Sequence, residues 1–167
     1  MTLPRRVAID TNVLIVANGE SSQASDECEI SAIEFLEFAE AGCLILIDDG
    51  YEIFEEYKRY CSFSGQPGVG DHFFMYLHRS QAVSGRVHKV RITPDENGSY
   101  AEVPDALAKF DPSDKKFIAT VLADNQGAPI VNCVDSDWNE SSGPLNACGV
   151  HIHELCPASL KVTKQKV

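Results

Sequence analysis

The sequence predicts an α/β protein, built as a three-layer α/β/α sandwich with a mostly parallel central sheet. Short apolar runs alternate along the chain with segments in which apolar residues recur at helical spacing. Runs such as Cys43–Ile47 are apolar throughout, which is typical of parallel strands covered by helices on both faces. The length of 167 residues fits a single domain, with one sizeable core, over residues 1–167.

Two buried strands and two helices are expected in the N-terminal half. The first helix covers residues 26–41, with Asp26 as its N-cap, Glu29 three residues later and Gly42 as its stop. Ile30 belongs to its expected apolar face. The other elements are a strand at residues 7–9 that runs into a turn at 10–12, a strand at 43–47 and a helix at 51–60.

Residues 62–105 have the weakest periodicity and are interpreted as a less regular insertion in the domain. Within them we expect a loop at 62–70, a short helix at 71–80, a strand at 86–93 and a turn at 94–99. The last third of the chain regains a clear pattern. Its expected elements are a helix with Asp111 as N-cap and Pro112 in its first turn, a strand at 129–134 and a final strand at 150–155.

The charge balance of −11 argues against a protein that coats nucleic acid through a broad basic face. It is compatible with an active site that holds divalent cations, because such a site needs clustered carboxylates. No apolar run approaches the length of a membrane span, so no membrane partner is expected. The polar residues Asp10 and Asn12 interrupt the N-terminal apolar run, which favours a cytoplasmic protein over a secreted one.

The six cysteines are expected to be reduced thiols, because no export signal is visible and no two of them form a C-x-x-C pair. A C-x-x-H-x-H-x-x-C pattern runs from Cys148 to Cys156 and makes zinc conceivable. An extended strand rises ~3.3 Å per residue and spreads those side chains apart, so we do not expect the four ligands to converge.

Carboxylates follow three of the predicted strands, at Asp10, at Asp48–Asp49 and at Asp135–Asp137. In a parallel sheet the carboxyl ends of the strands share one edge, which is where ligand sites gather. Several carboxylates on one rim repel one another unless a cation lies between them. Oxygen ligands suit Mg²⁺ or Mn²⁺ rather than zinc. The Asp48–Asp49–Gly50 segment is favoured as a helix cap and turn rather than as a pair of ligands.

Three segments together resemble the PIN-domain nucleases, a family that includes the ribonuclease toxins of bacterial toxin–antitoxin modules. They occur in the family's order and span most of the chain, although residues 62–105 do not resemble the small toxins closely. The segments are Val7–Leu14, Asp111–Ala119 and Ile130–Trp138.

The resemblance implies a metal-binding set of acidic residues. Asp10 matches the first acid of the family, Asp114 the third, Asp135 the fourth and Asp137 a frequent extra one. Thr11 and Asn12 match the polar pair that orients the first acid and contacts substrate. The second acid is a Glu on the helix after the second strand, and Glu56 is chosen over Glu52 and Glu55. Cys133 stands where the family commonly has Thr or Ser.

Arg86, Lys89 and Arg91 form the one basic stripe in the sequence. Such a stripe is often a charged edge strand that discourages pairing with other chains. In a nuclease it is also the expected contact to substrate phosphates.

The predicted function is that of an Mg²⁺- or Mn²⁺-dependent endonuclease that hydrolyses phosphodiester bonds of single-stranded nucleic acid by metal-activated water. RNA is favoured over DNA, and an antitoxin-like protein partner and self-association are further expectations from the resemblance. Two alternatives stay open. One is a receiver-like phosphoacceptor domain built on Asp48–Asp49, and the other is a catalytically silent PIN-like scaffold.

Overall fold

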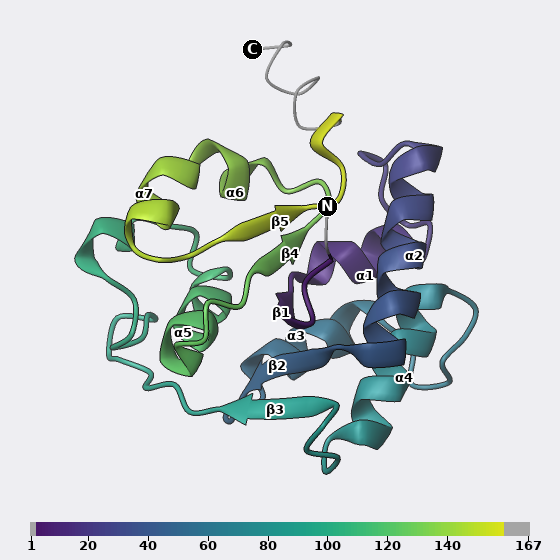
Figure 1. Cartoon of the computed structure of the whole chain (residues 1–167), viewed down its shortest axis with the longest axis horizontal. Helices are drawn as coiled ribbons and strands as arrows, with labels where there is room; N and C mark the ends of the chain where they lie inside the picture. The colour runs from purple at the N-terminus through teal and green to yellow at the C-terminus, as the bar shows by residue number, and fades with distance from the viewer. Residues whose placement is uncertain (1–2, 159–167) are drawn as a thin grey trace.

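A computed structural model describes residues 3–158 and has a five-stranded, all-parallel sheet in the order β3-β2-β1-β4-β5 (Figure 1). The predicted α/β class with a parallel sheet is confirmed. In the register, Val7 lies beside Ile45 of β2, and Ile9 lies beside Val131 of β4. The strands are β1 (Arg6–Ile9), β2 (Leu44–Asp48), β3 (Val87–Val90), β4 (Ile130–Asn132) and β5 (Ile152–Glu154).

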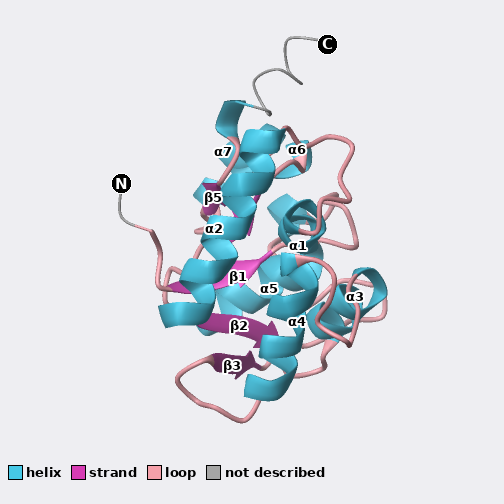
Figure 2. Ribbon diagram, turned by 90° about the vertical axis from the view of Figure 1, so that its right-hand side faces the viewer, coloured by secondary structure: helices cyan, strands magenta, loops and turns pink. Residues whose placement is uncertain are grey.

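Helices cover the sheet on both faces, which is consistent with the predicted three layers (Figures 1 and 2). Helices α1, α2 and α4 pack against one another on one side of the strands, and α5 contacts β1 to β4 from the other. The described helices are α1 (Thr11–Ala17), α2 (Asp26–Gly42), α3 (Glu52–Tyr60), α4 (Val69–Ser80), α5 (Lys115–Asp124), α6 (Ser136–Glu140) and α7 (Ser142–Ala147), with a 3₁₀ turn at Asp105–Leu107.

The order in which the chain adds parallel strands to the sheet changes direction between β1 and β4. It proceeds outward from β1 through β2 to the edge strand β3, and then crosses back over α5 to place β4 on the other side of β1. The connections leaving the carboxyl ends of β1 and β4 therefore diverge. In open α/β sheets such a switch point is where the loops leave a crevice for a ligand. The residues that follow β1 and β4 are Asp10 and Cys133–Asp135.

The core forms because the strands carry apolar side chains on both faces. Val7, Ala8 and Ile9 of β1 are fully buried at the centre of the sheet. Ile53 and Tyr57 of α3 are buried as the helical spacing predicts, and the Tyr57 hydroxyl donates to the carbonyl of Ile9. This bond ties α3 to the carboxyl end of β1. None of the helices in residues 3–158 combines the length and the apolar character that a membrane crossing requires.

Several helix boundaries differ from the prediction. The expected turn at residues 10–12 is the start of α1, with Asp10 as its N-cap. Ser25, not Asp26, caps α2 by accepting from the Cys28 N–H, because a serine hydroxyl at that position reaches the third helical amide.

Ile30 is 54% exposed, since α2 buries the face that carries Ala32, Phe35 and Leu36. The short helices α6 and α7 were not predicted, because five- and six-residue segments show too little periodicity.

The short helix and the strand expected within residues 62–105 are confirmed. They are α4, which packs on α1 and α2, and β3, which pairs with β2 over Ile45–Asp48. The longest connection among the described residues runs from residue 91 to residue 114 and contains one 3₁₀ turn. Helix α5 begins at Lys115, so Asp111 is not its N-cap but the start of the turn before it.

The prediction that all six cysteines are free thiols is wrong for two of them. Cys28 and Cys156 form a disulfide with their Cα atoms 5.5 Å apart, within the reach of such a bond. The pair is separated by 128 residues, so only the folded topology brings it together. The conceivable zinc set that includes His151 and His153 does not form, since no cluster of ligand atoms among residues 3–158 contains either histidine.

Candidate metal centre

Three carboxylates converge at the switch point of the sheet. Asp10 follows β1, Asp135 lies just beyond β4, and Asp114 immediately precedes α5. One oxygen from each lies within 4.8 Å of the others. Three segments that are far apart in the sequence therefore bring hard oxygen ligands to one point, as the motif order implied.

Each of these aspartates stands at the beginning of a helix, and the three differ in how their oxygens are used. Asp10 caps α1 by accepting from the Asn12 N–H (3.0 Å), and Asp135 caps α6 by accepting from the Asp137 N–H (3.0 Å). Asp114 occupies the N-cap position of α5 but accepts no capping hydrogen bond. The Asp114 carboxylate is not used in a capping hydrogen bond and so remains free for another partner.

Burial raises the pKa of all three carboxyl groups, and the negative charge of neighbouring carboxylates (Glu56 in the case of Asp10) adds to the shift. Desolvation is the largest cause in each case. For Asp114, the negative charges of Asp10 and Asp135 add to desolvation and raise the pKa to about 8. The pKa of Asp135 rises to about 6, with the hydrogen bond from the Asp137 N–H opposing the shift. Carboxylates held in this way favour either protons or a cation between them.

Trp138 orients Asp10 from the far side of the cluster. Its indole N–H donates to Asp10 Oδ2 at 2.6 Å, and the ring is fully buried against Phe110. The indole therefore holds one Asp10 oxygen while Asn12 holds the other. The sequence does not reveal this polar role of Trp138, because it depends on a donor three residues after Asp135 turning back toward β1.

Glu56 lies next to this group but is held by two other partners. Thr11 donates its hydroxyl to Glu56, and the Lys116 ammonium bonds Glu56 Oε1 at 2.9 Å. Glu56 is not one of the residues whose oxygens meet within 4.8 Å of Asp10, Asp114 and Asp135. Glu52 and Glu55 are exposed, so Glu56 is the acid of α3 that faces the centre. Lys116, which sequence reasoning did not single out, places a positive charge there.

Lys116→Met is expected to lower the free energy of unfolding by about 3 kcal/mol when a chelator is present, because it leaves Glu56 without its cation in a largely buried place. The double variant Lys116→Met/Glu56→Gln should recover most of that loss. Denaturant unfolding of both proteins measures the effect. In the single variant the Glu56 carboxylate has lost its ion-pair partner. If it then binds a metal ion, Mn²⁺ should raise the free energy of unfolding more in the single variant than in the double one. A single variant as stable as wild type in chelator would contradict the assigned pair.

A network of amides fixes the segment that carries Asp135. Asn12 Nδ2 donates to Asn132 Oδ1 (2.8 Å), and Asn12 Oδ1 accepts from the N–H groups of Cys133 and Val134. Asn132 in turn donates to the Asp135 carbonyl. The predicted orientation of Asp10 by Asn12 has a structural basis in the Asn12 N–H, which donates to Asp10 Oδ1. The Asn12 side chain instead joins the start of α1 to the end of β4, and its hydrogen bonds there do not favour the expected substrate contact.

Glu154, at the end of β5, extends this network and was missed from the sequence. Its Oε2 accepts from Asn132 Nδ2 (2.8 Å), while Oε1 is buried without a hydrogen-bond partner. Burial is the main reason that the pKa of Glu154 rises to about 7. Glu154 is identified by its position in the sheet. Strand β5 pairs with β4 at Asn132↔Glu154, so Glu154 lies at the carboxyl end of the strands, as Asp10 and Asp135 do.

Asp137 belongs to a second, more exposed group. Its carboxylate lies within 4.8 Å of those of Asp111 and Asp114, so Asp114 is shared by both groups. Asp111 and Asp137 are exposed, and Ser113 donates two hydrogen bonds to Asp111 that lower its pKa. The buried group is therefore the stronger candidate for a cation site.

The three residues of the basic stripe are at different ends of the sheet. Arg86 precedes β3 at its amino end, where its guanidinium lies over the Tyr76 ring and lines a cavity of about 310 Å³. Lys89 lies nearer the carboxyl end and donates to the Tyr51 hydroxyl at 2.8 Å, and Arg91 follows the strand. Lys89 and Arg91 are on the same edge of the sheet as the candidate centre, whereas Arg86 is not.

Asp48 has a structural role, as favoured from the sequence. It is fully buried, and its two oxygens accept from the N–H groups of Glu52 and Ile53 at the start of α3. A receiver-like phosphoacceptor requires an accessible carboxylate at this position. The observed capping therefore argues against Asp48 as the phosphoacceptor, whereas Asp49 of the same pair is exposed.

All candidate ligands in the buried group are carboxylate oxygens. Such oxygens suit hard divalent cations such as Mg²⁺ or Mn²⁺ and are poor ligands for soft metals. Comparisons of this chain with models of protein families, with curated proteins and with solved structures find no match.

Proposed function

We propose that this protein is an Mg²⁺- or Mn²⁺-dependent endonuclease that hydrolyses phosphodiester bonds of single-stranded nucleic acid, with RNA favoured over DNA. The observation that carries the proposal is the meeting of Asp10, Asp114 and Asp135 within 4.8 Å at the switch point of a parallel sheet. Partially buried carboxylates of this kind destabilise the fold unless they bind something positive. Asp10 and Asp135 also cap helices, but capping alone does not account for Asp114, which accepts no capping hydrogen bond and lies beside them. This disfavours the silent scaffold.

Different residues of the chain bind the cation and orient its ligands at this centre. Asp10, Asp114 and Asp135 supply the ligand oxygens, and Trp138 and Asn12 fix the orientation of Asp10. A bound Mg²⁺ or Mn²⁺ supplies Lewis-acid polarisation of the phosphodiester and activates the attacking water. Lys116 holds Glu56 beside the cluster and adds a positive charge that balances its acids. Asp111 and Asp137 lie on the outer rim with Asp114, and these three carboxylates would be the ones to hold any second cation.

The resemblance to PIN-domain nucleases supports RNA as the substrate and a single-stranded region as the place of cleavage. Under the same resemblance, an antitoxin-like protein and a second copy of the chain are proposed partners. The overall charge of −11 means that substrate is held by a few local cations rather than by a broad basic surface.

The test is a cleavage assay with purified protein on single-stranded RNA, single-stranded DNA and duplexes of the same sequence. We expect internal cleavage of the RNA in Mn²⁺ or Mg²⁺ and none in chelator. The end groups of the products, either a 5′-phosphate or a 3′-phosphate, identify which P–O bond of the phosphodiester is broken. Cleavage that is unaffected by chelator, or absence of cleavage for every substrate in both metals, would oppose the proposal.

The two basic residues on the edge shared with the centre are expected to contact phosphates. In an Asp10→Asn background, Lys89→Ala/Arg91→Ala should weaken RNA binding and lower the slope of log affinity against log salt by about 0.7 for each lost contact. Arg86→Ala is the matched control, because it removes the same type of charge at the other end of β3. An unchanged slope in the double variant, or an equal loss in Arg86→Ala, would assign the stripe to edge protection.

A further inference from the structure

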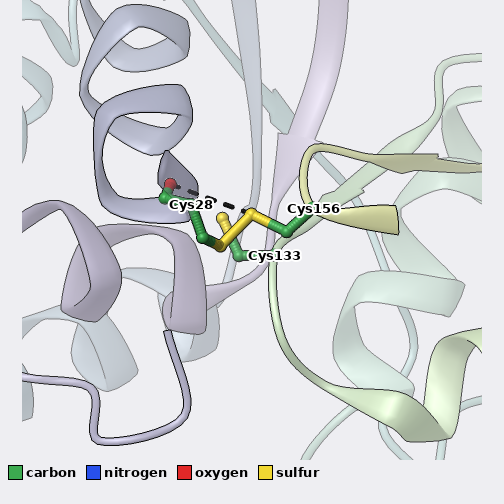
Figure 3. A group of neighbouring side chains, drawn as sticks. All are labelled: Cys28, Cys133 and Cys156. Atoms are coloured by element: carbon green, nitrogen blue, oxygen red, sulfur yellow. Dashed lines mark hydrogen bonds between the residues drawn. A yellow bond between two sulfur atoms is a disulfide. The ribbon is translucent and has the colours of Figure 1, made fainter. Parts of the chain in front are cut away.

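Three cysteine sulfurs from distant parts of the chain meet in the core beside the sheet (Figure 3). Cys28 is in the first turn of α2, Cys133 directly follows β4, and Cys156 follows β5. Cys28 and Cys156 are joined in the disulfide, and the Cys133 sulfur lies within 4.8 Å of both. All three side chains are buried. A disulfide needs only two of them, so the position of the third is unexplained by the bond itself.

Reduction converts this cluster into a set of three thiols facing one another. A dithiol reductant delivers two electrons and two protons to the Cys28–Cys156 bond, which breaks into two thiols, and the reductant becomes a disulfide. A metal ion binds the thiolate form of cysteine, so a cation that enters the reduced cluster displaces the thiol protons.

The Cys133 sulfur lies within 4.8 Å of the two sulfurs of the disulfide. Zn–S bonds of ~2.3 Å place sulfurs that share an ion roughly 4 Å apart, so the Cys28 and Cys156 sulfurs have to separate on reduction before the three hold one thiophilic ion. Sulfur ligands select Zn²⁺ and Cu⁺ over Mg²⁺. Within residues 3–158, no histidine, carboxylate or further cysteine joins this group, so the chain provides three ligands there. The acidic centre has only oxygen ligands, so the two sites differ in the ions they prefer.

We propose that Cys28, Cys133 and Cys156 form a second metal site, which binds one thiophilic cation (Zn²⁺ or Cu⁺) when the disulfide is reduced. Binding releases the three thiol protons to solvent and ties together α2, the end of β4 and the segment after β5. The site reaches the acidic centre through Cys133, because the Cys133 N–H donates to Asn12 Oδ1 and Asp135 is two residues further on. The proposal does not depend on the nuclease function.

The test uses Cd²⁺ as a probe of sulfur ligation in the full chain. A phosphine reductant opens the disulfide, and a thiol count confirms the change from four free cysteines to six, since two of the six are paired. Reduced protein should then bind one Cd²⁺ per chain with an ultraviolet sulfur-to-cadmium charge-transfer band, and Zn²⁺ should displace it. Oxidised protein should lack the band. Oxygen ligation at the acidic centre gives no such band, so failure at one site is separable from failure at the other.

Cys133→Val retains the disulfide pair and removes the third ligand. It should reduce the charge-transfer intensity by about one third, with a loss of about 10-fold or more in Cd²⁺ affinity. Cys43→Val is the matched control, because Cys43 is a buried free thiol outside the cluster, and it should bind Cd²⁺ as wild type does. Cys156→Ala provides a second test if circular dichroism shows that Cys133→Val is unfolded. Reduced wild type without the band, or a folded Cys133→Val protein that binds Cd²⁺ as tightly as wild type, would overturn the proposal.

Discussion

Asp10→Asn is expected to lower the rate of metal-dependent RNA cleavage by about 10³-fold or more. The substitution removes the charge of one of the three carboxylates that meet at the centre, and metal-ion stabilisation of a phosphoryl transition state contributes several kcal/mol. One side-chain oxygen is kept and still accepts from the Asn12 N–H. The new amide nitrogen faces the Trp138 indole N–H, so that hydrogen bond is lost. Single-turnover cleavage at saturating Mn²⁺ measures the effect.

Trp138→Phe provides a graded comparison for this first prediction. It keeps an aromatic ring in the same buried place and removes only the N–H that orients Asp10. Loss of such an orienting partner typically costs about 10- to 100-fold in metal affinity or activity. We therefore expect an intermediate defect that higher Mn²⁺ concentrations partly rescue. If Asp10→Asn retained activity within a few-fold of wild type while still folded, cleavage would have to arise elsewhere in the protein.

Asp114→Asn is expected to stabilise the metal-free protein, by clearly more at pH 8 than at pH 5. The pKa of Asp114 is raised to about 8 in the folded state, mainly by burial, above its ordinary value of 3.8. A raised pKa means that the folded state binds the proton more tightly, so the stability it contributes is complete below pH 3.8 and is lost as the pH rises toward 8. Asn resembles the protonated acid at every pH. The expected gain at pH 8 is on the order of a few kcal/mol.

Denaturant unfolding in chelator, at pH 5, 6.5 and 8, measures this linkage. Asp111→Asn is the matched control in the same turn, because hydrogen bonds from Ser113 lower the pKa of Asp111 and its removal should not stabilise the protein at pH 8. With Mn²⁺ at pH 8, wild type should become more stable than Asp114→Asn, because metal binding adds RT ln(1 + [L]/Kd) to the free energy of unfolding of wild type. Parallel pH profiles for wild type and Asp114→Asn would show that Asp114 is not in the environment described here.

The sheet and the principal acids were predictable because their signals are local. Apolar runs such as residues 43–47 and 129–134 identify the central strands, and an aspartate after a buried strand predicts a position on the rim. Asp10 and Asp135 needed only that argument. Asp114 needed the motif, because it precedes a helix rather than following a strand.

The partners of those acids were not predictable, because they depend on contacts across the fold. The Trp138–Asp10 hydrogen bond joins residues 128 positions apart, and the Lys116–Glu56 ion pair spans 60. The Cys28–Cys156 disulfide likewise depends on where α2 begins relative to the end of β5. Helical periodicity also failed at Ile30, since it indicates that a residue lies near a helix face but not which face the neighbouring elements cover.

Calorimetric titration of Mn²⁺ into metal-free protein at pH 8 tests the central claim most directly. Wild type is expected to bind Mn²⁺ at the buried group, and Asp10→Asn/Asp114→Asn/Asp135→Asn is expected to lose that binding while remaining folded. Glu27→Gln/Glu37→Gln/Glu96→Gln removes the same charge from exposed positions, so it controls for bulk electrostatics and should bind as wild type does. No binding by wild type, or equal binding by wild type and the aspartate variant, would contradict a cation site formed by these three carboxylates.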